Sequence, residues 1–138
     1  MIDEKLYKIV ESALECFREE LPSYGVRQNF PKNSCEEVSS ILLNILETEG
    51  YVNFKMIKGS NKKGKHHFWL ESDIQIIDLT AHQFEGISIP FLLIDKNEYP
   101  LNKIFCENIR SEEIDTNWPY LSELLPRIKN IFYRKYYK

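Results

Sequence analysis

Apolar side chains recur at helical spacing in two segments of the chain, residues 3–20 and residues 35–49. In both segments they stand three and four positions apart with polar residues between them, which predicts two helices that each bury one face. The apolar positions are Leu6, Ile9, Val10, Ala13, Leu14 and Phe17 in the first segment, and Val38, Ile41, Leu42, Ile45 and Leu46 in the second. Residues 21–34 between them carry two prolines and a glycine, and are predicted to form a loop.

The second predicted helix has recognisable ends. Ser34 and Glu37 form an S-x-x-E capping box, with Ser34 as the N-cap residue, and Gly50 stands where a glycine ends many helices. Cys35 is therefore predicted to be the first residue of this helix.

After residue 50 the pattern changes to one typical of strands. Residues that favour β-structure are concentrated in five segments, which are 51–58, 65–71, 74–80, 89–95 and 103–106. A polar turn at 59–64 separates the first two, and Ser72-Asp73 is predicted to join the second and third as a two-residue hairpin connection. Cys106 is expected to be buried in the last strand.

The C-terminal segment 118–138 is predicted to be a helix interrupted near Pro126. Its aromatic side chains are expected to pack on the domain while its lysines face water. Together these elements predict an α+β fold in one domain, residues 1–138, with an antiparallel sheet and helices at both ends of the chain.

The predicted hairpin has a consequence for two polar residues. With Ser72-Asp73 as the turn, His67 stands directly opposite Asp78 on the same face of the two strands, with Cβ atoms about 4.5–5.5 Å apart. A carboxylate at that distance can hydrogen-bond the imidazole, orient it and favour its protonated form. His66 is expected to point to the other face, beside Phe68.

Composition and charge narrow the function classes. The chain has 138 residues, of which 43% are hydrophobic and 28% charged, and its net charge of -3 argues against nucleic acid as a partner. No apolar run reaches the ~18–20 residues that span a bilayer, and the N-terminus lacks the basic and apolar regions of a signal peptide. We therefore expect a cytoplasmic protein with no membrane contact, although delivery elsewhere by a specialised system stays open.

The three cysteines, Cys16, Cys35 and Cys106, are odd in number and form no C-x-x-C motif, which disfavours a disulfide framework or a zinc site. Cys16 lies beside the apolar stripe of the first helix and is expected to be structural. Cys35 differs because the start of a helix favours a thiolate, which is the nucleophilic form of cysteine, and offers backbone N–H groups to an oxyanion. A base is then required, and His67 paired with Asp78 meets that need.

A metal site is the weaker interpretation of the same histidines. His66, His67 and His82 with Asp78 could be assembled into a ligand set, but none of them shows the spacing of a known zinc motif. No metal or cofactor is expected.

The same residues carry a resemblance to a known family. The segment FPKNSCEEVSSILLNILETEGY, followed by HHFWLE and IIDLTAHQF, resembles a group of bacterial proteins whose pattern runs FPxGxC, an apolar helix, HAWLE and IIDITADQF. That group is similar to the transglutaminase-like branch of the papain-like cysteine hydrolases. The resemblance covers about residues 30–84.

This resemblance implies a papain-like fold in which the helix that carries the nucleophile packs on an antiparallel sheet. It also implies a Cys-His-Asp triad, with Cys35 as nucleophile, His67 as the histidine of H-x-W beside Trp69, and Asp78 as the acid. The chain departs from the pattern at three positions, which are Asn33 for glycine, Phe68 for a small residue and His82 for an acid. None of these removes a member of the triad.

The implied activity is acyl transfer through a thioester, as in a peptidase, amidase, deamidase or transglutaminase, on a protein, peptide or amide substrate. Gln28, Asn29 and Asn33 are equal candidates for a second oxyanion donor. The alternative is a non-catalytic module that binds a protein or peptide and retains the fold. The sequence does not choose among hydrolysis, deamidation and transfer, and it leaves the oligomeric state open.

Overall fold

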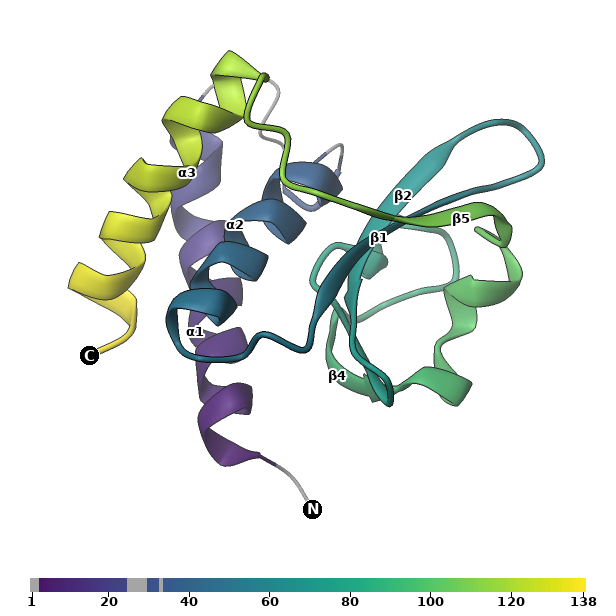
Figure 1. Ribbon diagram of the computed structural model, residues 1–138, viewed down its shortest axis with the longest axis horizontal. Helices are drawn as coiled ribbons and strands as arrows, with labels where there is room; N and C mark the ends of the chain where they lie inside the picture. Colours follow the sequence, from purple (N-terminus) through teal and green to yellow (C-terminus); the bar gives the residue numbers. More distant parts are fainter. Residues whose placement is uncertain (1–2, 25–29, 33) are drawn as a thin grey trace.

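Helices and sheet form two layers. The computed structural model describes residues 3–24, 30–32 and 34–138, and within these α1 (Glu4–Glu20), α2 (Cys35–Thr48) and α3 (Pro119–Ile131) lie on one side of a five-stranded sheet (Figure 1). The predicted α+β class with an antiparallel sheet is confirmed. None of the helices in these ranges is long and apolar enough to cross a bilayer.

Both helices predicted from the N-terminal half are present. α1 begins after Asp3, whose carboxylate accepts a hydrogen bond from the backbone N–H of Leu6 at 3.0 Å. The apolar stripes of α1 and α2 are buried together against the sheet, and Cys16 lies fully buried among them. The expectation that Cys16 is structural agrees with this position.

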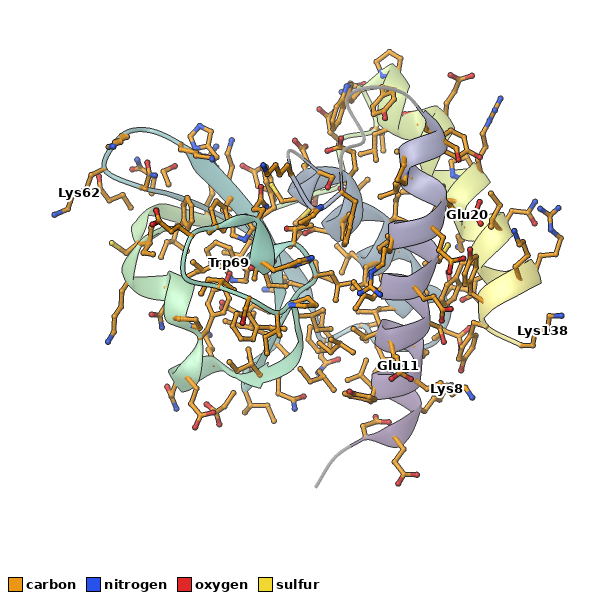
Figure 2. The ribbon with its side chains drawn as sticks, turned by 180° about the vertical axis from the view of Figure 1, so that it is seen from behind. Lys8, Glu11, Glu20, Lys62, Trp69 and Lys138 are labelled. Carbon is orange, nitrogen blue, oxygen red and sulfur yellow. The ribbon has the colours of Figure 1, made fainter. Side chains whose placement is uncertain are left out.

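The sheet contains β1 (Lys55–Ser60), β2 (His66–Glu71), β3 (Gln75–Asp78), β4 (Phe91–Asp95) and β5 (Glu107–Glu112). Its strand order is β4-β3-β2-β1-β5, and every neighbouring pair is antiparallel. The β1–β2 hairpin extends beyond the rest of the sheet, with Lys62 at its tip (Figures 1 and 2).

The prediction of a strand at residues 103–106 is wrong. Residues Pro100–Lys103 form a 3-10 helix, and the strand that follows is β5, whose sequence ENIRSE is almost entirely exposed. An edge strand of this kind buries few side chains, so it lacks the apolar alternation on which the prediction depended. Cys106 precedes β5 and is exposed, which also corrects its predicted burial.

A second apolar core covers the face of the sheet that the helices leave open. The chain passes from β4 at one edge to β5 at the other, and on the way it places Tyr99, Leu101 and Phe105 against that face. They pack on inward-facing residues of the strands, among them Trp69, which lies in the half of the molecule away from α3 (Figure 2).

Gly59 of β1 makes this packing possible. It stands opposite His67 of β2. A Cβ atom at Gly59 would come within 2.4 Å of the backbone oxygen of Phe105 and 2.8 Å of the Trp69 ring. The absence of a side chain there lets the crossing segment approach the sheet.

The register of the β2–β3 hairpin differs from the predicted one. Leu70 pairs with Ile77 and Glu71 with Ile76, so β3 is shifted by two residues. The tip of the turn is Asp73-Ile74, because Ser72 accepts hydrogen bonds on its side-chain oxygen from the N–H groups of Ile74 and Gln75 at 3.4 and 3.1 Å. The side-chain bonds of Ser72 thus select a turn one residue later than predicted.

The predicted direct pairing of His67 with Asp78 is therefore wrong, yet the two residues remain on one face. Side chains alternate with a period of two along a strand, so a shift by an even number of residues keeps every side chain on its predicted face. His67 and Asp78 become diagonal neighbours instead of opposite ones.

α3 runs through Pro126 without interruption, which corrects the predicted break. Pro126 has no N–H to donate to the carbonyl of Ser122, one helical turn earlier. Both residues are exposed, so water can hydrate that carbonyl instead. Beyond α3, Phe132 is buried, and the single O–H of Tyr136 lies within hydrogen-bond distance of the carboxylates of Glu19 and Glu20 of α1, at 2.7 and 2.6 Å. The aromatic tail packs on the domain, as expected.

Candidate active site

Cys35 occupies the first position of α2, as the sequence predicted. Ser34 is the N-cap residue, but its side chain donates to the carbonyl of Pro31 at 3.2 Å and makes no capping bond. The capping bond predicted for Ser34 is therefore not formed. The first N–H groups of a helix have no partner within it, and in α2 these groups begin with the N–H of Cys35 itself. The Cys35 side chain is half-buried.

His67 lies near the start of β2, at a point where two strands separate. β2 pairs with β3 only at Leu70 and Glu71, whereas it pairs with β1 along its whole length. The His67 side chain is fully buried, with an exposed fraction of 0%.

Asp78, the last residue of β3, holds one nitrogen of this ring. The Nε2 atom of His67 lies 2.7 Å from Oδ2 of Asp78, and the carboxylate is only 1% exposed. The same Oδ2 accepts a hydrogen bond from the Tyr99 hydroxyl at 2.6 Å, while Oδ1 accepts from the backbone N–H and hydroxyl of Thr80 at 3.2 and 3.4 Å. The predicted histidine–aspartate hydrogen bond is confirmed.

The second ring nitrogen of His67 has no partner like Asp78. Nδ1 is buried and has no hydrogen bond of standard geometry among the described residues. The Cys35 side chain interacts with the ring closely enough to raise the pKa of His67.

The environment of His67 favours its protonated form. Burial lowers the pKa of His67, but the charge and hydrogen bond of Asp78, helped by Cys35, outweigh burial and raise it to about 9. The site therefore holds an imidazole that favours its cationic form next to the Asp78 carboxylate.

Aromatic rings exclude water from this pair. The His67 ring lies 4.8 Å from the Phe84 ring in an edge-on contact, 5.2 Å from Phe105 and 5.8 Å from Trp69, measured between centroids. Phe84 and Phe105 also contact each other at 5.0 Å. Such packing fixes the plane of the imidazole and holds Nε2 against Asp78.

The other cysteines have different surroundings. Burial raises the pKa of Cys16 to about 12, which keeps that thiol protonated and unreactive. Cys106 is exposed. Of the three, only Cys35 interacts with a histidine in the part of the chain that the structure describes.

The other histidines do not join a metal site. Nδ1 of His66, which is exposed at the first position of β2, lies 2.6 Å from the Ser60 hydroxyl. His82 packs its ring on Phe30 at 5.7 Å, and burial, followed by the charge of Arg18, lowers its pKa. Within the described ranges, no group of three or more histidine, cysteine or acidic side chains could hold a metal ion.

A cavity of about 690 Å³ opens next to the start of α2. Its lining includes Glu36, which follows Cys35, and Phe68, which follows His67, together with Lys58 and residues 111–117. A space of this size accommodates a few residues of an extended chain.

Sequence reasoning missed part of the site. Tyr99 and Phe105 contact the histidine–aspartate pair, but they belong to no motif and reach it only because the chain crosses the sheet. Thr80 also bonds to Asp78, and it had a local signal, since it follows Asp78 by two residues in the IIDLT stretch, where a carboxylate often accepts a backbone N–H. The suggested oxyanion donors Gln28, Asn29 and Asn33 lie outside the described residues.

The raised pKa of His67 predicts a pH-dependent stability. In a Cys35→Ser variant, in which His67 titrates without the thiol, the free energy of unfolding should be highest below pH 6.5 and fall by roughly 2 kcal/mol as pH rises through the folded-state pKa. The sign follows because the folded state binds the proton more tightly than the unfolded state. Urea unfolding at pH 6 and pH 9.5 measures this, and adding His67→Gln should abolish the difference. An equal difference in both variants would assign it to other groups.

Cys35 of α2, His67 of β2 and Asp78 of β3 thus lie close together. A short hydrogen bond joins His67 to Asp78, and Cys35 interacts with the His67 ring without one. Trp69 and Tyr99 pack beside them at a ring distance of 5.5 Å. Comparison of the chain with protein-family models, curated proteins and solved structures found no match.

Proposed function

We propose that this chain is a cysteine-dependent acyl-transfer enzyme of the papain-like and transglutaminase-like type, with Cys35 as nucleophile, His67 as acid and base, and Asp78 as the residue that orients His67. One observation carries the proposal. The Nε2 atom of buried His67 lies 2.7 Å from the Asp78 carboxylate, and the Cys35 side chain interacts with the same ring closely enough to raise its pKa. A buried histidine that is oriented by an acid and lies close to a cysteine is the arrangement that activates a thiol nucleophile.

The first half of the reaction forms a thioester. The Cys35 thiolate attacks the carbonyl carbon of an amide, a C–S bond forms, and the carbonyl electron pair moves to the oxygen. When this electron pair returns, the C–N bond breaks and the amine leaves with the proton from Nδ1 of His67. His67 is then neutral and still bonded to Asp78 through Nε2.

The second half releases the acyl group. Neutral His67 takes a proton from water or from an amine, which attacks the thioester carbon. The C–S bond breaks, and Cys35 returns as a thiolate beside protonated His67. Water gives hydrolysis or deamidation, whereas an amine gives transfer.

One further feature supports the proposal. The backbone N–H of Cys35 lies at the positive end of α2, where it would stabilise the negative oxygen of the tetrahedral intermediate.

The rate of alkylation of Cys35 tests the proposal. In a Cys106→Ser background, iodoacetamide should modify Cys35 at nearly the same rate from pH 6 to pH 8. An unperturbed thiol in a reference peptide should react roughly 80-fold faster at pH 8 than at pH 6, because its thiolate fraction rises by that factor. Mass spectrometry of the digested protein assigns the modified cysteine, and buried Cys16 serves as the internal unreactive site.

A second measurement examines acyl transfer directly. Incubation with p-nitrophenyl acetate should acetylate Cys35 through a thioester that hydroxylamine removes. The proposal is wrong if the alkylation rate of Cys35 rises with pH like that of the reference peptide and no acetyl adduct forms. That result would favour a binding module with the same fold.

A further inference from the structure

The Asp78 carboxylate has a third partner outside the Cys-His-Asp set. The Tyr99 hydroxyl donates to Oδ2 of Asp78 at 2.6 Å, and this is the same oxygen that faces Nε2 of His67 at 2.7 Å. Tyr99 comes from the segment that crosses the sheet between β4 and β5, far along the chain from both residues. Its side chain is 1% exposed.

The other bonds of Asp78 are weaker anchors. Oδ1 accepts from the N–H and the hydroxyl of Thr80, two residues along the chain, at 3.2 and 3.4 Å. These bonds are long, and their donors belong to the same short segment as Asp78, so they would move together with it. Without Tyr99, the only strong partner that would hold Oδ2 is His67 itself, so the carboxylate could turn away together with the ring.

Tyr99 is itself held in place. Its ring packs on Trp69 at 5.5 Å and on Phe91 in an edge-on contact at 6.0 Å. Burial, followed by the negative charge of Asp78, raises the pKa of Tyr99 well above its usual value. Its hydroxyl therefore remains a donor at every pH at which the protein is folded.

Packing alone does not require this hydroxyl. Phenylalanine would fill the same apolar cluster, and burying a hydroxyl is unfavourable unless it finds a partner. The partner that it finds is the acid next to His67. A short charge-assisted bond from a rigid ring fixes the position of that acid.

We propose that Tyr99 is a positioning residue, which holds the Asp78 carboxylate against Nε2 of His67 and thereby maintains the thiolate–imidazolium pair at Cys35. This inference rests on the proposed function and extends the triad to a fourth side chain. Tyr99 acts through Asp78 and does not touch Cys35 or the substrate.

The test is the pH profile of Cys35 alkylation in Tyr99→Phe, in the Cys106→Ser background. We expect the alkylation rate at pH 6 to fall about tenfold, because loss of the Tyr99 hydrogen bond leaves the Asp78 carboxylate less firmly held against His67. The rate at pH 9.5 should stay within about twofold of the parent. A purely structural role would change the thermal stability and leave the profile where it was. Phe91→Leu is the matched control, since it loosens the Tyr99 ring but keeps the hydroxyl.

A double-mutant cycle gives a second criterion. If Tyr99 acts through Asp78, Tyr99→Phe should have no further effect on the rate at pH 6 in an Asp78→Asn background. Independent, multiplicative effects would overturn the inference, and so would a Tyr99→Phe profile equal to that of the parent.

The pKa of His67 provides a measurement independent of reactivity. NMR titration of the His67 ring in Cys35→Ser should give a lower pKa when Tyr99→Phe is added, and an unchanged pKa would contradict the role of Tyr99. Failure of the proposed function has a different signature, since the parent protein itself would then lack fast alkylation of Cys35 at pH 6.

Discussion

Replacement of His67 by alanine is expected to lower the rate of Cys35 alkylation at pH 6 by about tenfold or more. In the proposed function the reactivity of Cys35 depends on protonated His67, so the variant should lose it at this pH. The gain in thiolate is partly offset by the lower intrinsic nucleophilicity of a stabilised thiolate, which is why we do not expect the full factor given by the thiolate fraction. Acetylation of Cys35 by p-nitrophenyl acetate should be lost together with the fast alkylation.

A second variant and a neighbouring control distinguish chemistry from unfolding. His67→Gln keeps most of the buried volume and a donor for Asp78, and it should lose the reactivity as fully as His67→Ala. His66→Ala, one residue away on the exposed side of β2, should retain it. Circular dichroism confirms that each variant is folded, and a folded His67→Gln protein with the wild-type rate would show that Cys35 does not depend on this histidine.

Replacement of Asp78 by alanine should lower the free energy of unfolding by about 3–5 kcal/mol, the range observed when one partner of a buried ion pair is removed. His67 and the Tyr99 hydroxyl both lose their acceptor in a site closed to water. His67 would also lose the charge that chiefly raises its pKa, so burial would outweigh the smaller effect of Cys35 and favour the neutral ring. Fast alkylation of Cys35 at pH 6 should therefore disappear as well.

Urea unfolding at pH 7 measures this loss. Asp73→Ala is the control, because Asp73 is exposed at the tip of the β2–β3 turn, where substitutions change stability by about 0.5 kcal/mol or less. A loss below about 1 kcal/mol in Asp78→Ala would mean that the buried contacts of this carboxylate contribute little. The milder Asp78→Asn shows which part of the effect belongs to the charge.

The helical part of the fold could be predicted because its signals are local. The apolar stripes of α1 and α2 follow from spacing over three or four residues, and Ser34 marks the start of α2 within one turn. Cys35 at the first helical position follows from this alone. The capping bond itself could not be predicted, since Ser34 donates to the Pro31 carbonyl, and that contact depends on how the preceding chain folds.

The strands were less predictable because their partners are distant. β5 carries no apolar alternation, since it is an exposed edge strand, and the apolar residues before it, Leu101 and Phe105, belong to a crossing segment and not to a strand. The break expected at Pro126 did not occur because packing of Leu124 and Ile128 holds α3 while the proline faces water.

The sequence by itself determined that Cys35 begins a helix and that His67 and Asp78 share one face of a hairpin, because helical caps and the two-residue period of strands are local properties. The two-residue shift in register is also local in origin, because it follows from the bonds of Ser72 within its own turn. Only the tertiary structure decided the rest. Packing of α2 brought Cys35 close to the His67 ring, and the crossing chain brought Tyr99 to Asp78. Both depend on contacts between residues far apart in the chain, which no local pattern encodes.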